Sequence, residues 1–164
     1  MSKAFDMNVY VYDPYVEKER VKISGAIPVD NISENLQKMD AVTLHCPKND
    51  ETTDLFTKKE FNLMKKSSFI INCARGGILN EEDLYEALKD ENISGAGLDV
   101  FDVEPTPSSN PLFKLNNVIL SPHIAGVTVE STIRMATETV QNVLDVLDDK
   151  INQSVVVNNK EIGM

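Results

Sequence analysis

Short apolar runs alternate with amphipathic or polar stretches along most of the chain. Six of the runs are rich in the β-branched and aromatic residues typical of strands. They cover residues 8–12, 26–29, 40–45, 68–73, 94–100 and 117–120. The run at 68–73 is almost continuously apolar, as in a strand that is buried on both faces. We therefore predict six strands.

Helical patterns fill most of the intervals between these runs. A charged stretch over 16–24 and a short one over 32–39 are predicted helices, and Thr57 and Asn80 are suited to cap the next two. The longest helix is predicted over 129–147, where apolar residues recur at helical spacing. These residues are Ile133, Ala136, Val140, Val143, Leu144 and Leu147. Strands that alternate with helices predict an α/β fold, a doubly wound parallel sheet with helices on both faces.

The amino-acid composition limits the kinds of molecule that the chain is expected to bind. The 16 Lys and Arg residues against 26 Asp and Glu give a net charge of −10, which opposes binding to nucleic acid or to an anionic membrane. No apolar run approaches the ~20 residues that cross a bilayer, and the first residues do not resemble a signal peptide, so we expect a cytoplasmic protein. Two cysteines and two histidines form neither a disulfide framework nor a set with metal-ligand spacing, so no metal is expected.

In a doubly wound sheet, ligands bind at the carboxyl ends of the strands. Asp13 follows the first predicted strand, where an acid can accept the hydroxyls of an adenine ribose and repel a 2′-phosphate. This favours NAD over NADP. The alternative is a simple turn residue before Pro14. The glycine-rich phosphate loop that should precede such an acid by ~20 residues is missing, and Gly95-Ala-Gly97 lies inside a strand, where its glycines suit close packing.

Arg75 follows the buried strand at 68–73 and precedes Gly76-Gly77, where backbone can approach a ligand closely. Its guanidinium group suits two-pronged binding of a carboxylate. The alternative is an ordinary surface arginine.

His123 and Glu104 lie in neighbouring strand-end loops. Imidazole carries protons near neutral pH, and Glu104 could pair with it and stabilise the imidazolium. Each residue alone would more often be a hydrogen-bonded loop side chain. We interpret His45 as structural or adjacent to a cofactor, and Cys46 and Cys73 as small buried residues rather than nucleophiles.

Five segments in this order resemble the D-isomer-specific 2-hydroxyacid dehydrogenases. They are residues 9–15, 40–47, 69–77, 97–105 and 121–126, and the resemblance extends over about 4–158. It implies a reversible oxidation of a D-2-hydroxy acid to a 2-oxo acid with NAD, on a substrate similar to 3-phosphoglycerate or glycerate.

The resemblance also assigns roles to residues. Arg75 would bind the substrate carboxylate and carbonyl, His123 would be the acid/base, and Glu104 would orient it. The residues that would line the NAD site are Asp13, Cys46, Cys73, Ala74, Arg75, Asp99, His123, Ile124, Ala125 and Gly126.

The chain also departs from the family pattern, because members are about twice as long and have a separate substrate domain. We expect residues 1–150 to form a partial NAD-binding domain without its first strand and glycine-rich loop, and 151–164 to form a tail. The missing strand would lie at the centre of the sheet, between the strand that ends at Asp13 and the one that begins at Asp40. We therefore expect the isolated chain to be inactive or weakly active, and we also expect a homodimer.

Two alternatives remain open. The chain could be a non-catalytic binding or assembly module that fills its central gap by pairing with another chain. It could also be an NADP reductase of another α/β type, which Asp13 disfavours.

Overall fold

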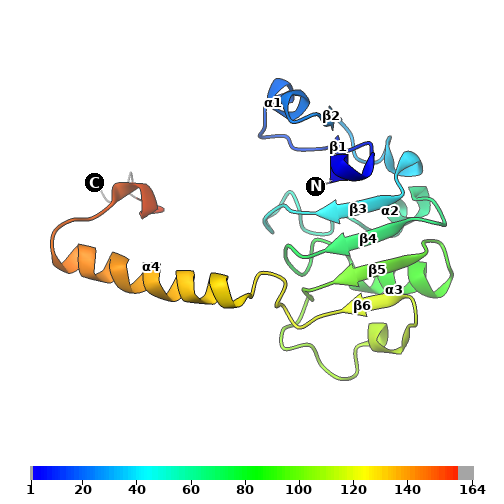
Figure 1. Ribbon diagram of the computed structural model, residues 1–164. Helices are drawn as coiled ribbons and strands as arrows, with labels where there is room; N and C mark the ends of the chain where they lie inside the picture. The colour runs from blue at the N-terminus through cyan, green and yellow to red at the C-terminus, as the bar shows by residue number, and fades with distance from the viewer. Residues whose placement is uncertain (1, 159–164) are drawn as a thin grey trace. The chain divides into compact units, whose positions relative to one another are not determined.

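The computed structural model describes residues 2–158, which form two compact units that divide between His123 and Ile124 (Figure 1). Each unit is described by itself. The predicted tail at 151–164 is described only as far as residue 158, and its remaining residues lie outside the described part of the chain.

The first unit is built on a four-stranded parallel sheet. Its strands are β3 (Ala41–Leu44), β4 (Phe69–Asn72), β5 (Gly95–Leu98) and β6 (Val118–Leu120), in the order β3-β4-β5-β6. All four point the same way, so their carboxyl ends share one edge of the sheet (Figure 1). The predicted α/β fold with a parallel sheet is confirmed.

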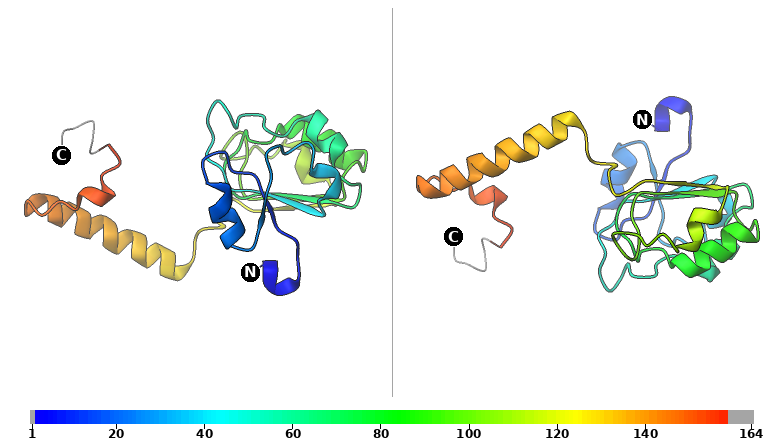
Figure 2. Two further views of the ribbon diagram at one scale, coloured as in Figure 1. Left: turned by 90° about the horizontal axis from the view of Figure 1, so that it is seen from above. Right: turned by 90° about the horizontal axis from the view of Figure 1, so that it is seen from below.

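The core of this unit lies between the sheet and the helices α2 (Lys58–Leu63) and α3 (Glu81–Lys89), which cover one face of it (Figure 2). Side chains in register on that face are buried, as Ile70 and Ala96 are. The largest buried side chains of the core are Leu36, Phe56, Phe61, Ile70, Ile78, Leu84, Leu88, Ile93 and Leu112. Each such side chain contributes about 1.5–3 kcal/mol to folding. On the opposite face Phe69 and Ile119 are exposed.

A second, smaller sheet contains β1 (Tyr10–Val11) and β2 (Ile27–Pro28), which are parallel and joined by α1 (Lys18–Ile23). Among residues 2–158 no ladder joins β1 to β3. This division agrees with the gap that the sequence predicts between these two strands.

All six predicted strands are shorter in the structure by one to three residues, and two predicted helices are also shorter. The strand at 8–12 is reduced to Tyr10–Val11, because β2 is the one strand with which it pairs among the described residues. The helix at 32–39 is a 3-10 turn, η2 (Leu36–Lys38). Asn31 accepts the Glu34 N–H at 3.4 Å, which is the contact of a helix cap, but only a single 3-10 turn follows it. The stretch at 16–24 is helical only over Lys18–Ile23.

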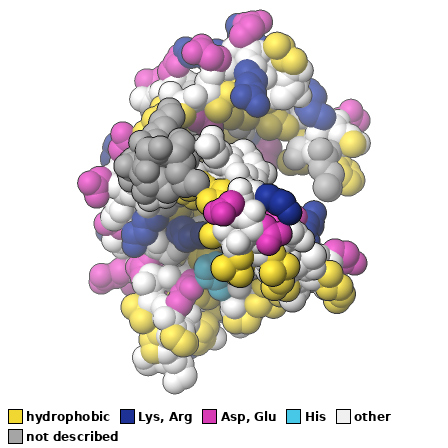
Figure 3. Space-filling model, turned by 90° about the vertical axis from the view of Figure 1, so that its left-hand side faces the viewer, with side chains coloured by type: hydrophobic (Ala, Val, Ile, Leu, Met, Phe, Trp, Pro, Cys, Tyr) yellow, Lys and Arg dark blue, Asp and Glu magenta, His cyan; other side chains and the backbone are white. Residues whose placement is uncertain are grey.

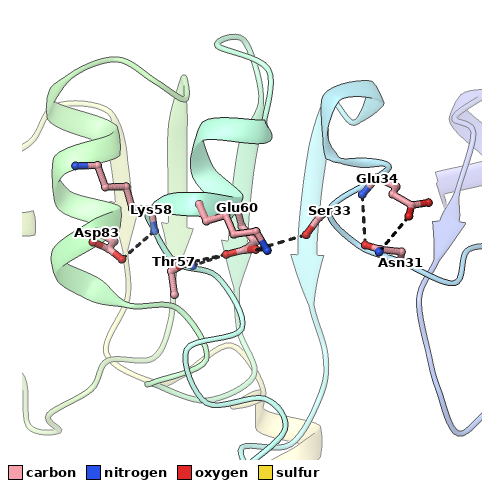
Figure 4. Close-up of polar contacts among 8 residues, drawn as sticks. Asn31, Ser33, Glu34, Thr57, Lys58, Glu60 and Asp83 are labelled. Atoms are coloured by element: carbon pink, nitrogen blue, oxygen red, sulfur yellow. Dashed lines mark hydrogen bonds and ion pairs between the residues drawn. The ribbon is translucent and has the colours of Figure 1, made fainter.

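The two predicted caps are present. The Asn80 side chain accepts the Asp83 N–H at 3.1 Å and starts α3. Glu60 Oε2 accepts both the N–H of Thr57, at 3.2 Å, and its hydroxyl, at 2.8 Å, and so closes the first turn of α2 (Figure 4). These contacts fix the helix ends that face the loops after β3 and β4.

Three short 3-10 turns complete the described secondary structure besides η2: η1 (Ser2–Phe5), η3 (Pro111–Lys114) and η4 (Gln153–Val155). The second unit contains η4 and α4 (Val129–Leu147), whose bounds match the prediction. Thr128 caps α4 through a hydrogen bond from the Ser131 N–H at 3.1 Å. No helix in the described part of the chain is long and apolar enough to cross a membrane.

Candidate functional site

The carboxyl edge of the four-stranded sheet collects the predicted catalytic residues. Arg75 follows β4, Glu104 lies in the loop after β5, and His123 follows β6. A histidine side chain is visible at the surface in the space-filling view (Figure 3).

Glu104 and His123 are paired. His123 Nδ1 lies 2.8 Å from Glu104 Oε2, and Glu104 Oε1 accepts the Phe101 N–H at 2.9 Å. The hydrogen bond with His123, followed by that from Phe101, holds the pKa of Glu104 below its usual value. An ionised carboxylate only accepts hydrogen bonds, so the shared proton belongs to His123 Nδ1. Nε2 of His123 is then the ring nitrogen available for chemistry.

The backbone around His123 is held by Asp99, which is buried. Asp99 accepts the His123 N–H with its carbonyl at 2.8 Å and the Ser121 hydroxyl with Oδ1 at 2.6 Å. His123 itself has φ of 56°, in the left-handed region that non-glycine residues seldom occupy. Such strain costs of order 1–3 kcal/mol and persists where surrounding contacts impose it. The end of β6 therefore fixes the position of the histidine.

The turn that carries Arg75 is shaped by Asn72, a buried residue at the end of β4. Asn72 donates through Nδ2 to the Arg75 carbonyl at 2.9 Å and accepts the Ala74 N–H at 3.0 Å. The Arg75 side chain is exposed, and Nη1 donates to the Ala74 carbonyl. The sequence analysis did not single out Asn72. Its signal was a polar residue at the end of an otherwise apolar, buried strand.

Gly76 approaches protein rather than a ligand. A Cβ atom built on Gly76 would lie 1.8 Å from the Phe101 carbonyl oxygen and 2.8 Å from the Asp102 nitrogen. The absence of a side chain thus lets the Arg75 turn pack directly against the loop that carries Glu104. The sequence analysis expected close approach to a ligand at Gly76-Gly77, and the close neighbour of Gly76 in the structure is the backbone of Phe101 and Asp102.

A cavity of about 440 Å³ opens between the ends of β3 and β4. It is lined by His45, Cys46, Pro47, Lys48, Cys73, Ala74 and Arg75. Four of the predicted NAD-site residues therefore share one cavity. Cys73 is exposed, so the prediction that it is buried was wrong. It lies just beyond the last residue of β4, at the open edge of the sheet. Cys46 is half-buried, and this burial raises the pKa of its thiol.

Asp13 belongs to a different cavity, of about 580 Å³, bordered by the loop after β1 and by α1. Its Oδ1 accepts the Tyr15 N–H at 2.9 Å, which is the turn-forming role considered as an alternative. Asp13 is nevertheless exposed and lines this cavity together with Tyr12, Val29 and Asp30.

The remaining predicted residues, Ile124, Ala125 and Gly126, belong to the second unit, where they precede α4. The Gly126 carbonyl accepts the Ser131 hydroxyl at 2.8 Å. Within the described residues, no group of three or more His, Cys, Asp or Glu side chains is arranged to hold a metal ion.

Comparison with known proteins gives a consistent result. The family model described as "D-isomer specific 2-hydroxyacid dehydrogenase, NAD binding domain" matches residues 1–125. The D-3-phosphoglycerate dehydrogenase of Methanocaldococcus jannaschii is 42% identical over 155 residues, which are 94% of this chain and 29% of that protein. The glyoxylate reductase of Thermofilum pendens is 38% identical over 162 residues, which are 97% of this chain and 46% of that protein. The chain thus spans less than half the length of either relative.

The fold is also similar to that of a dehydrogenase of known structure. The D-lactate dehydrogenase of Aquifex aeolicus, complexed with NAD and lactic acid, superposes with a TM-score of 0.79 at 32% identity. The match covers 90% of this chain and 48% of that one.

Proposed function

Because the chain belongs to the D-isomer-specific 2-hydroxyacid dehydrogenase family and carries its NAD-binding domain, we propose that it is the NAD-binding portion of an enzyme that reversibly oxidises a D-2-hydroxy acid to a 2-oxo acid. When bound, NAD accepts a hydride from C2 of the substrate. The residues of this chain bind the acid and handle the proton.

The hydrogen bond between Glu104 and His123 is the observation that carries the proposal. With Nδ1 held by the carboxylate at 2.8 Å, Nε2 of His123 is free to take the substrate hydroxyl proton as the C2–O bond becomes a carbonyl. The imidazolium that forms is stabilised by the neighbouring negative charge of Glu104. In the reverse direction the same nitrogen returns the proton to the oxygen.

Arg75 binds the substrate carboxylate. One of its five N–H donors is used by the Ala74 carbonyl, which leaves the rest of the guanidinium group for a carboxylate and a carbonyl oxygen. The cavity beside it, with Cys46, Cys73 and Ala74 in its walls, suits the nicotinamide end of the cofactor. Ile124, Ala125 and Gly126 are further proposed NAD contacts, and Asp99 holds the backbone of His123.

Asp13 determines the specificity for NAD over NADP. Its exposed carboxylate, at the edge of a separate cavity after β1, accepts the ribose hydroxyls of NAD and repels the 2′-phosphate of NADP. The residues present therefore fit both ends of the dinucleotide. None of the 164 residues supplies the glycine-rich pyrophosphate turn, since the chain contains no Gly-x-Gly-x-x-Gly. The 164-residue chain alone is for this reason inactive or weakly active.

The substrate is a small hydroxy acid similar to 3-phosphoglycerate or glycerate. This choice is supported by the relatives, which are named D-3-phosphoglycerate dehydrogenase and glyoxylate reductase. The protein acts as a homodimer, for which the exposed apolar residues of α4 offer a contact surface.

The split sheet favours one alternative, a non-catalytic assembly module that closes its gap with a strand of another chain. β1 and β3 each leave one edge without a ladder partner among the described residues. A tight dimer without affinity for NAD would support this alternative.

The proposed function is tested in a hybrid enzyme, in which residues 4–158 of this chain replace the matching segment of the Methanocaldococcus jannaschii relative. His123 is then changed to Gln in this hybrid enzyme. We expect NAD-dependent oxidation of D-3-phosphoglycerate or D-glycerate to fall by about 10²–10⁴-fold, with NAD affinity unchanged. Undiminished turnover in the variant would overturn the role of His123. Loss of NAD binding would instead assign it to the cofactor site.

A further inference from the structure

Glu81, the first residue of α3, bridges that helix to the loop between β5 and β6. Its Oε1 accepts the Asp102 N–H at 2.6 Å, and its Oε2 accepts the Asn110 side-chain amide at 3.0 Å. Both donors are more than 20 residues away along the chain, and the carboxylate is half-buried. One side chain therefore fastens two points of the loop to the helical layer.

The first of these points adjoins the proposed catalytic pair. Asp102 follows Phe101, whose N–H donates to Glu104 Oε1 at 2.9 Å, and the other oxygen of Glu104 holds His123 at 2.8 Å. Two successive backbone N–H groups thus bind two different carboxylates, Glu81 and Glu104. Phe101 joins the two peptides that carry these N–H groups, so a shift of the peptide between Phe101 and Asp102 would break the bond to Glu81 and, through Phe101, disturb the bond to Glu104.

The same peptide also touches the turn of Arg75. Gly76 has no room for a Cβ atom because the Phe101 carbonyl and the Asp102 nitrogen occupy that space. The loop anchored by Glu81 is accordingly the element that relates Glu104 to Arg75.

The first turn of α3 contains two further acids, Glu82 and Asp83. They show whether the contact with the loop is specific to Glu81 or common to every acid at this helix end. Glu82 is exposed, and none of the described residues is hydrogen-bonded to its carboxylate. Asp83 accepts the Lys58 N–H at 2.8 Å, within the helical layer (Figure 4). All three acids interact favourably with the helix dipole, but Glu81 is the one that contacts the catalytic loop.

We propose that Glu81 is a positioning residue. It fixes the 101–104 loop, and thereby places Glu104 where it can hold His123 by Nδ1 beside the turn that carries Arg75. This inference rests on the proposed function only for its catalytic consequence. The geometric part, from Glu81 to Glu104, concerns the chain without substrate or cofactor.

The geometric part is tested by following the Glu104 carboxyl carbon by NMR across the acidic pH range. In the unaltered chain Glu104 should titrate below its ordinary pKa of 4.5, because His123 and Phe101 stabilise its charged form. In Glu81→Ala the loop is released, and we expect the pKa of Glu104 to rise towards 4.5. Glu82→Ala, which removes a charge from the same helix turn, should leave the pKa of Glu104 where it was.

Glu81→Asp is a second, milder variant, to be used if the Glu81→Ala chain does not fold. It keeps the charge at the helix terminus but is one methylene shorter, so it should lose the loop contacts and raise the pKa of Glu104 as Glu81→Ala does. An unchanged pKa of Glu104 in a folded Glu81→Asp or Glu81→Ala chain would overturn the proposal.

The catalytic consequence is tested separately in the hybrid enzyme described above, which carries residues 4–158 of this chain within the Methanocaldococcus jannaschii relative. Glu81→Asp should lower kcat by up to about 10²-fold with NAD affinity unchanged, since small misplacements of catalytic groups have effects of this size. If the pKa of Glu104 shifts but neither Glu81→Asp nor His123→Gln affects turnover, the positioning holds and the proposed function fails. If His123→Gln abolishes turnover and the pKa of Glu104 does not move in Glu81→Asp, the positioning alone fails.

Discussion

At the scale of single residues, Gly76 sets the distance between the two loops of the site. We predict that Gly76→Ala destabilises the protein by about 1–3 kcal/mol, since the new methyl group would overlap the Phe101 carbonyl, which is backbone and cannot rotate away. Chemical denaturation of the two proteins measures the difference.

Gly97→Ala is the matched control for this prediction. A Cβ atom at Gly97 would meet Ile71 at 3.8 Å, an ordinary contact, so the substitution should be nearly neutral. Equal stability of the Gly76→Ala and Gly97→Ala proteins would contradict the packing that we describe.

The sequence pointed to Arg75, Glu104 and His123 because each stands just after a predicted strand of a parallel sheet. It offered a signal for Asn72 that was not used, the polar residue at the end of a buried strand, but it could not indicate Glu81. The partners of Glu81 are Asp102 and Asn110, which reach it only after the loop has folded back onto α3. Contacts between residues this far apart in sequence leave no periodic pattern, and Cys73 was misjudged for the related reason that exposure depends on where the strand ends.

At the scale of elements, Glu60 connects the start of α2 with the segment that follows β2. Its Oε2 binds Thr57, and its Oε1 accepts the Ser33 hydroxyl at 3.4 Å, as Figure 4 shows. Burial raises the pKa of Glu60, but the hydrogen bonds from Thr57 outweigh it and leave the pKa below the ordinary 4.5. The folded protein therefore favours the charged form.

We predict that Glu60→Gln lowers the free energy of unfolding by about 1 kcal/mol at neutral pH, because hydrogen bonds to a charged acceptor are the stronger ones. A lowered folded-state pKa stabilises the protein above the unfolded-state pKa, and this contribution is lost as the pH falls through the folded-state value. The difference between the two proteins in denaturant unfolding should consequently disappear in acid.

Lys59→Ala provides the control, since Lys59 is an exposed neighbour that pairs with Glu60 Oε1 at 3.4 Å. Such surface pairs contribute ~0–1 kcal/mol, so the pH dependence should persist in this variant. A pH-independent difference between the unaltered protein and Glu60→Gln would refute the assignment of the effect to charge.

Elements whose stability is local were predicted best. The bounds of α4 follow from its apolar spacing, which was visible in the sequence, and its start is fixed by the Thr128 cap, which the sequence analysis did not single out. The strand at 8–12 and the helix at 32–39 depend on the elements packed beside them. Their shortening to Tyr10–Val11 and Leu36–Lys38 reflects those contacts rather than their own propensities.

At the scale of the whole molecule, two apolar surfaces have no cover among the described residues. One is the sheet face that carries Phe69 and Ile119, and the other is α4, none of whose side chains is buried. The chain also spans only 29% of the Methanocaldococcus jannaschii relative and 46% of the Thermofilum pendens one. Exposed apolar surface of this kind is typical of contact sites.

We predict that the purified chain forms a dimer through α4, in keeping with the proposed homodimer. Val129, Ile133, Ala136, Val140, Val143 and Leu147 follow one another at alternating steps of four and three residues, the spacing of helices that pair along their length. Burial of each large aliphatic side chain contributes about 1.5–3 kcal/mol. Val140→Glu, which would place a charge in the contact, should therefore weaken the dimer by at least about tenfold in Kd.

Sedimentation velocity over a range of concentrations measures this change. Asn142→Glu, two residues along and on the opposite side of α4, introduces the same charge outside the apolar stripe and should leave the dimer intact. Equal weakening by the two variants would indicate a general effect of charge, and a monomer at every concentration would exclude α4 as a dimer contact. If Val140→Glu and the unaltered chain dimerise equally well, the exposed edges of β1 and β3 become the surface to test next.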